Sequence, residues 1–163
     1  MRETMIEMRV ISKAFPGVQA LRDCSLEVRQ GEVHALLGEN GAGKSTLMKI
    51  LTGIYQADAG EIFFNGRKTK ITSVLDARAL GITMIHQELN LLNNLTIAQN
   101  IFIGKEIKHH GVFLDERATV AMAAELLDRV SLHVDPKTTV SELTVAQQQM
   151  VEIAKAISYN SRV

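Results

Sequence analysis

The chain has 163 residues, enough for one compact domain or for one domain with a small appendage. Its 18 basic residues balance 18 acidic residues, so no net charge favours binding to nucleic acid or to an anionic membrane surface. Cys24 is the only cysteine, which excludes an internal disulfide bond and a cysteine metal site and fits a reducing cytoplasm.

Neither the start of the chain nor its longest uncharged run has the pattern of a membrane-directed segment. The first ten residues, MRETMIEMRV, carry acidic side chains and no apolar core, unlike a secretory signal. The run Leu89–Gly104 is interrupted by Asn and Gln side chains, so we do not expect it to span a bilayer.

Strands are predicted in the first half of the chain. Residues 24–28 (CSLEV) alternate apolar and polar, which is typical of a half-buried strand, whereas residues 33–37 (VHALL) form an apolar run typical of a buried strand. The pair Asn65-Gly66 lies between two extended runs and predicts a tight hairpin turn. Another short buried strand is expected at Gly81–Ile85.

Helices are predicted after the glycine-rich loop and in the second half of the chain. Gly53 is suited to end the first of them, whose apolar positions are Leu47, Ile50, Leu51 and Ile54. Asp115 is suited to cap a second helix, with an apolar face that includes Met122, Leu126, Leu127 and Val130.

A third helix is predicted from about Val145 to Ser158. Thr144 and Gln147 match the capping-box pattern at its start. Its apolar stripe contains Val151, Ala154 and Ile157.

The segment LLGENGAGKST contains the complete phosphate-loop pattern between Gly38 and Ser45. Gly41 and Gly43 permit backbone conformations in which successive N–H groups point at an anion, and the following helix adds its positive end. Lys44 supplies a charge for the β- and γ-phosphates, and the Ser45 hydroxyl is a ligand for Mg²⁺. Kinases, GTPases, helicases and transport ATPases all use this loop, so other residues must discriminate among them.

Three separated segments carry further information: Ser12–Thr46 (SKAFPGVQALRDCSLEVRQGEVHALLGENGAGKST), His86–Glu88 (HQE) and Ser141–Ile157 (SELTVAQQQMVEIAKAI). Together, and in this order along the chain, they resemble the nucleotide-binding subunits of ABC transporters. The chain is most similar to the ATP-binding subunits of sugar importers of the ribose/galactose type, which carry two cassettes in one polypeptide, and it looks like the first cassette.

The resemblance implies an α/β fold, a P-loop NTPase (RecA-like) core with an N-terminal antiparallel β-subdomain and a helical subdomain. It implies three parts: residues 1–87 as the ATP-binding core, residues 88–144 as the helical subdomain, and residues 145–163 as the signature helix returning to the core. The C-terminal part of the core is expected to be missing.

The resemblance also implies a binding site for ATP and Mg²⁺. Phe15 matches the aromatic residue that stacks on adenine, although a turn aromatic beside Pro16-Gly17 is the plainer alternative. The nucleotide site would consist of Phe15, Gly38, Glu39, Asn40, Gly41, Ala42, Gly43, Lys44, Ser45 and Thr46.

Gln87 matches the glutamine that reaches Mg²⁺ and the attacking water, which makes Lys44 and Gln87 the expected catalytic residues and Ser45 and Gln87 the expected metal ligands. An amide suits this role because it donates and accepts hydrogen bonds without titrating. The alternative is an ordinary surface glutamine. Neighbouring His86 is expected to be a packing or hinge residue.

The signature motif of the family, Leu-Ser-Gly-Gly-Gln, corresponds to residues that depart from it here: Leu143, Thr144, Val145, Ala146 and Gln147. In the family this motif acts in trans, on nucleotide held by the partner cassette. Val145 and Ala146 replace its two glycines, which puts hydrolysis at that composite site in doubt. The alternative is an amphipathic helix with an ordinary cap.

The family also places an aspartate and a glutamate on a strand after the signature motif. The segment Val112–Glu116 (VFLDE) is rejected as that strand, since it precedes the signature and Asp115 is suited to cap a helix. The acidic strand and the switch histidine are expected beyond the present sequence, so the fragment itself is expected to be inactive in hydrolysis.

The expected parent is an ATPase of a sugar importer, peripheral at the cytoplasmic face of the cell membrane. Its expected partners are membrane permease subunits, a second cassette and, indirectly, a periplasmic sugar-binding protein, with no nucleic acid. The run Leu89–Gly104 fits either a groove for the permease or plain helical core. Alternatives are a soluble non-transport ABC ATPase and a regulatory ATP-binding module, and the identity of the sugar is not encoded here.

Overall fold

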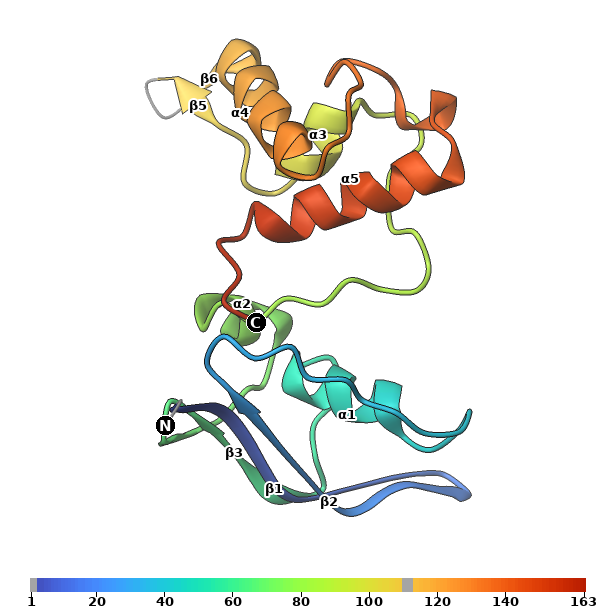
Figure 1. The fold of residues 1–163 in the computed structure, drawn as a ribbon, viewed down its shortest axis with the longest axis vertical. Helices are drawn as coiled ribbons and strands as arrows, with labels where there is room; N and C mark the ends of the chain where they lie inside the picture. Colours follow the sequence, from blue (N-terminus) through green and yellow to red (C-terminus); the bar gives the residue numbers. More distant parts are fainter. Residues whose placement is uncertain (1–2, 110–112) are drawn as a thin grey trace. The chain divides into compact units, whose positions relative to one another are not determined.

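The computed structural model describes residues 3–109 and 113–163. The chain folds as two compact units, Met1–Ile82 and Thr83–Val163, each with its own hydrophobic core. We call them the first unit and the second unit, and Figure 1 shows the elements of each. None of the helices in the described part of the chain combines the length and the apolar character needed to traverse a bilayer.

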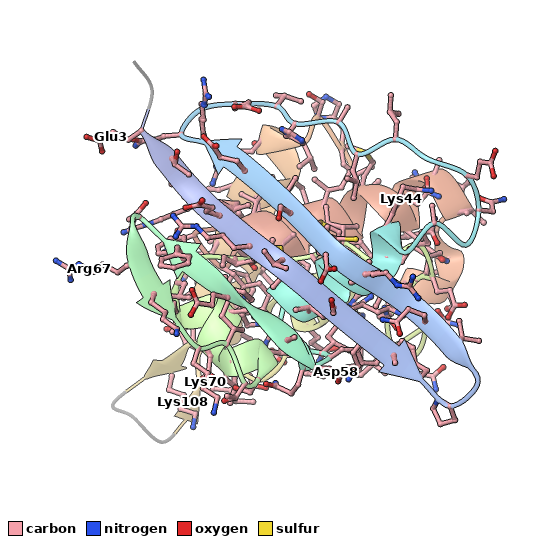
Figure 2. All side chains as sticks on the ribbon, turned by 90° about the horizontal axis from the view of Figure 1, so that it is seen from below. Glu3, Lys44, Asp58, Arg67, Lys70 and Lys108 are labelled. Atoms are coloured by element: carbon pink, nitrogen blue, oxygen red, sulfur yellow. The ribbon has the colours of Figure 1, made fainter. Side chains whose placement is uncertain are left out.

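The first unit is built on a four-stranded antiparallel sheet with the strand order β2-β1-β3-β4. Its strands are β1 (Thr4–Phe15), β2 (Val18–Arg29), β3 (Ala59–Phe64) and β4 (Arg67–Thr69). Figure 2 looks onto this sheet, with β1 between β2 and β3. The strand predicted at residues 24–28 lies within β2 and alternates half-buried apolar with exposed polar residues, so that prediction is confirmed.

The predicted hairpin turn at Asn65-Gly66 connects β3 to β4. Phe64 pairs with Arg67 across the turn, and the φ angles of Asn65 and Gly66 are 49° and 73°. Two successive positive φ angles define the turn geometry whose twist matches that of the flanking strands. The prediction is confirmed.

Helix α1 (Lys44–Leu51) buries one face against this sheet, and helix α2 (Val74–Ala79) completes the core of the first unit. Each fully buried Leu or Ile side chain contributes roughly 1.5–3 kcal/mol. The core side chains from β1 and α1 are Ile6, Met8, Ile11, Leu47, Ile50 and Leu51.

The predicted end of the first helix is confirmed, since Gly53 follows the capping residue Thr52 with a φ of 73°. The assignment of Ile54 to the apolar face is wrong, because the chain leaves the helix before it and its side chain is exposed.

The two buried strands predicted at residues 33–37 and Gly81–Ile85 are absent from the structure. Val33 and Leu37 are almost fully exposed, at 101% and 88%. A parallel strand is stable only when a neighbouring strand satisfies its backbone N–H and C=O groups, and none of the described strands pairs with either segment. The apolar composition of these segments was therefore a misleading signal for their structure here.

The second unit is mainly helical, with α3 (Ile97–Phe102), α4 (Glu116–Arg129) and α5 (Val145–Ile157) packed on one another. A short antiparallel pair, β5 (Lys108–His109) and β6 (Phe113–Leu114), precedes α4, and the 3₁₀ helix η1 (Val140–Glu142) precedes α5. The fully buried side chains at the centre of this core are Ile97, Ile101, Ala123, Leu127, Val140, Val151 and Ala154.

The caps predicted for α4 and α5 are confirmed. The Asp115 carboxylate accepts the backbone N–H of Ala118 at 2.9 Å and so caps α4. The Thr144 hydroxyl accepts the backbone N–H of Gln147, and the Gln147 side chain accepts the N–H of Thr144.

The prediction that Met122 belongs to the buried face of α4 is wrong, because its side chain is 45% exposed. Ala123 takes its place with 0% exposure, because the helix is rotated so that a small side chain faces the closely packed neighbouring helices. The prediction for Leu126 and Leu127 is confirmed, and Val130 packs at the edge of the core.

Asn100 is a fully buried polar side chain in the core of the second unit. Its Oδ1 accepts the N–H of Leu92 at 2.7 Å, and its Nδ2 donates to the carbonyls of Leu92, Leu95 and Thr96. A buried amide with all its groups bonded is stable in a core. Asn100 therefore fixes the irregular segment that leads into α3.

Candidate functional site

The phosphate loop, Gly38–Ser45, connects an irregular exposed segment to helix α1 in the first unit. Gly41 and Gly43 have φ angles of 87° and 84°, in the left-handed region that glycine tolerates best. The loop N–H groups that donate no hydrogen bond to any described residue include those of Gly41, Gly43, Lys44 and Ser45. Unpaired N–H groups at a helix start are the usual donors to a bound anion.

Helix α1 is unlike the other α-helices of the described chain in the way it begins. Ser73, Thr96, Asp115 and Thr144 each cap a following helix with a side-chain oxygen. Gly43, the N-cap of α1, has no side chain, and no side chain caps this helix. The positive end of α1 is therefore open to an external anion.

A close approach to β2 also requires glycine at position 43. A Cβ atom built on Gly43 would lie 2.5 Å from the carbonyl oxygen of Ala20 and 2.6 Å from Cδ2 of Leu21. At Gly41 a Cβ would meet no atom within 4 Å, so only the backbone conformation favours glycine there. The loop is thus anchored on the sheet at Gly43.

The Lys44 side chain folds back over the loop, where its ammonium group donates to the carbonyl oxygens of Gly38 at 2.7 Å and Glu39 at 2.9 Å. This position puts a full positive charge beside the unpaired N–H groups. The Ser45 hydroxyl is exposed and makes no hydrogen bond with any described residue. Amides, ammonium and hydroxyl together form a set of groups that suits a polyphosphate with its cation.

Phe15 lies at the end of β1, also in the first unit, beside the turn at Pro16-Gly17. Its half-buried ring packs edge-on against Tyr55, with ring centroids 5.2 Å apart and an interplanar angle of 69°. The Lys13 ammonium group lies 5.6 Å from the Phe15 centroid and forms an ion pair with Asp58 at 2.6 Å. This ion pair, with its hydrogen bond, lowers the pKa of Asp58 below its ordinary value.

Sequence reasoning did not single out Tyr55 or Asp58. Both follow α1 in a segment whose local pattern predicts only the end of a helix, and their contact with Phe15 and its neighbours spans about forty residues of sequence. The one available signal was a lone aromatic residue, Tyr55, in the short connection that follows the helix.

The predicted site residues fall in both units. The phosphate loop and Phe15 belong to the first unit, whereas Gln87 and the signature segment, Leu143–Gln147, belong to the second. The Gln87 side chain is exposed, in an irregular segment together with His86. Asn90, three residues later, donates its N–H to the Glu152 carboxylate on α5 at 2.8 Å.

The signature segment surrounds the start of α5. Leu143 is buried in the core of the second unit, whereas Val145 is 64% exposed and Ala146 is exposed. Gln148 donates from its amide to the carbonyls of Val140 and Leu143, both at 3.2 Å, and so ties η1 to α5. The capping box of Thr144 and Gln147 satisfies the backbone N–H groups of these two residues, whereas those of Val145 and Ala146 donate no hydrogen bond to any described residue.

Among the described residues, no group of three or more His, Cys, Asp or Glu side chains is arranged to hold a metal ion.

The sequence matches the ABC transporter family over residues 21–163. The chain therefore belongs to the ABC transporter family. It has the α/β fold of the ATP-binding cassettes, since it superposes on a solved cassette of an ABC transporter with a TM-score of 0.83 and 26% identity, covering 99% of this chain and 66% of that one.

Curated relatives include a ribose/galactose/methyl galactoside import ATP-binding protein of Burkholderia ambifaria, 60% identical over 98% of this chain. A protein of the same description from Albidiferax ferrireducens is 53% identical, also over 98% of this chain. The present chain spans only 31% and 32% of the lengths of these two relatives.

Proposed function

We propose that this chain is the nucleotide-binding front part of a longer ATP-binding subunit that drives import of a sugar. The observation that carries the proposal is the open start of α1, where the loop N–H groups and the Lys44 ammonium converge with no side-chain cap. The two relatives described above are import ATP-binding proteins, which supports the proposed role in sugar import.

In this proposal the loop from Gly38 to Thr46 holds the phosphates of ATP and Phe15 takes the adenine base. Lys44 exchanges its two loop carbonyls for oxygens of the β- and γ-phosphates, a stronger charge-assisted interaction. Mg²⁺, held by Ser45 and reached by Gln87, would neutralise phosphate charge when bound. Residues 1–87 act as the ATP-binding core, residues 88–144 as the helical subdomain, and residues 145–163 as the signature helix.

The proposed setting is peripheral, at the cytoplasmic face of a membrane, with permease subunits and a second cassette as partners. The signature residues Leu143–Gln147 act on the nucleotide of the second cassette. We expect the present chain to bind ATP weakly and not to turn it over, since it spans only 31% and 32% of the lengths of the two relatives.

The test is the affinity of the chain for ATP, measured by isothermal titration calorimetry, before and after Lys44→Ala. Removing a charged hydrogen-bond donor costs roughly 1.5–3 kcal/mol, so the variant should bind about 10- to 100-fold more weakly. Lys70→Ala is the matched control, because Lys70 is an exposed lysine that lies well away from Lys44 in the first unit (Figure 2). Equal affinities of Lys44→Ala and the unmodified chain would overturn the proposal.

A second candidate, a regulatory cassette that binds ATP without rapid hydrolysis at one composite site, is favoured by the start of α5. There the cap is closed and the exposed Val145 stands where the family has glycine. The test is ATP hydrolysis by the longer protein after Val145→Gly with Ala146→Gly. A large gain in rate supports a regulatory site in the natural sequence, whereas an unchanged rate argues against it.

A further inference from the structure

One segment, the connection between α1 and β3, contacts both the Phe15 ring and the backbone that precedes it. Tyr55 provides the edge-to-face ring contact, at a centroid distance of 5.2 Å. Such pairs have a preferred geometry, so one ring restricts the orientation of the other. The Tyr55 ring therefore limits how the Phe15 ring can turn about its side-chain bonds.

The second contact acts on the backbone next to Phe15. Asp58 accepts the N–H of Ala14 at 2.7 Å with one carboxylate oxygen and binds the Lys13 ammonium at 2.6 Å with the other. Its own N–H donates to the carbonyl of Ser12 at 2.9 Å. Asp58 thus fixes three successive residues of β1, directly before Phe15.

Tyr55 is itself fixed to the helix that follows the phosphate loop. Its N–H donates to the carbonyl of Lys49 at 3.0 Å, and the Lys49 ammonium lies 5.4 Å from the Tyr55 ring centroid. Helix α1, which runs from Lys44 to Leu51, thereby connects the phosphate loop to the segment that contacts Phe15.

We propose that Tyr55 and Asp58 are positioning residues that hold the Phe15 ring ready to stack on the adenine base of the nucleotide. This inference rests on the proposed function, because it assumes that Phe15 meets the base. It predicts that Tyr55 and Asp58 contribute to the affinity for the base, whereas Lys44 and the loop amides contribute to the affinity for the phosphates.

The experiment compares the affinities of the chain for ATP and for inorganic tripolyphosphate, which lacks a base. Tyr55→Leu keeps an apolar side chain but removes the ring, and should weaken ATP binding about three- to tenfold while leaving tripolyphosphate binding unchanged. Tyr55→Phe keeps the ring and should restore ATP affinity. In a Phe15→Leu background, Tyr55→Leu should have no further effect, because the ring that it orients is gone.

Tyr159→Leu is the matched control, since the other tyrosine of the chain also lies beside a lysine, with the Lys105 ammonium 3.6 Å from its ring centroid, but belongs to the second unit. It should change neither affinity. Asp58→Ala serves as an independent variant if Tyr55→Leu does not fold, and it should also weaken ATP binding selectively.

The outcomes separate this inference from the proposed function. If Phe15→Leu weakens ATP binding but Tyr55→Leu and Asp58→Ala do not, or if they weaken both ligands equally, the positioning role is wrong and the proposed function stands. If Phe15→Leu leaves ATP affinity unchanged, or the unmodified chain does not bind ATP, the base site is wrong and the inference fails with it.

Discussion

Helices α1 and α5 both begin at segments that resemble nucleotide-contacting motifs, yet their first turns are built differently. At α1 the capping position is Gly43, which leaves the helix N–H groups unpaired. At α5 the Thr144 hydroxyl and the Gln147 amide bond the backbone of the first turn reciprocally. The cap of α5 therefore takes up the N–H of Gln147 and leaves fewer free donors for an anion than the first turn of α1 does.

The difference arises from single residues. A glycine cap costs the helix only a few tenths of a kcal/mol relative to a side-chain cap, so α1 gives up little stability for an accessible positive end. The contact of Gly43 with β2 then fixes where that end points. In α5 the cap contributes stability to the second unit and takes up the N–H group of Gln147.

The largest expected effect comes from adding a side chain at Gly43, the N-cap of α1. Gly43→Ala places a Cβ 2.5 Å from the Ala20 carbonyl oxygen in a left-handed conformation, and should lower the free energy of unfolding of the first unit by at least about 2 kcal/mol. Gly41 also has a positive φ, but a Cβ there would meet no atom within 4 Å. Gly41→Ala should therefore lower the free energy of unfolding by only about 1 kcal/mol. Amide NMR signals followed during urea unfolding would measure each. Equal losses in the two variants would contradict the anchoring role of Gly43.

An intermediate effect is expected from opening the start of α5. Thr144→Ala removes the capping oxygen and should destabilise the second unit by about 1 kcal/mol, while Thr144→Ser, which keeps the oxygen, should cost much less. Amide hydrogen exchange in α5 is the measurement. The same signals in α1 serve as the internal reference and should not change, and no loss in Thr144→Ala would mean that the cap adds nothing.

The smallest expected effect is acid sensitivity of one cap. The capping box of α2 contains a carboxylate, Asp76, which accepts from the Thr72 hydroxyl at 2.6 Å and from the N–H of the N-cap Ser73 at 3.0 Å. These bonds, the one from the Thr72 hydroxyl first, lower the pKa of Asp76 below its ordinary 3.8. The stabilisation is therefore complete above the ordinary value and is lost as the pH falls through the lowered pKa.

The cap of α5 uses an amide, Gln147, and does not titrate. NMR signals of Thr72 and Ser73 should shift in acid as the α2 cap opens, whereas those of Thr144 and Gln147 should follow only global unfolding. Asp76→Asn is the control that should abolish the selective response. Simultaneous changes at both caps in the unmodified chain would show that the α2 cap has no separate transition.

Several features were predictable from sequence because their chemistry is local. The turn at Asn65-Gly66 and the caps at Asp115 and Thr144 depend on residues within a few positions of one another, and all three have the predicted structure. The phosphate-loop pattern likewise predicted a helix after Gly43, which α1 is.

Only the tertiary structure decided which residues meet across the chain. The strand predicted at residues 33–37 depended on a partner that the described residues do not provide, so its apolar pattern was insufficient. Ala123 rather than Met122 faces the core on α4, because little space is available between the packed helices. The contact of Phe15 with Tyr55 joins residues forty positions apart and depends on how β1 and α1 pack, which no local pattern encodes.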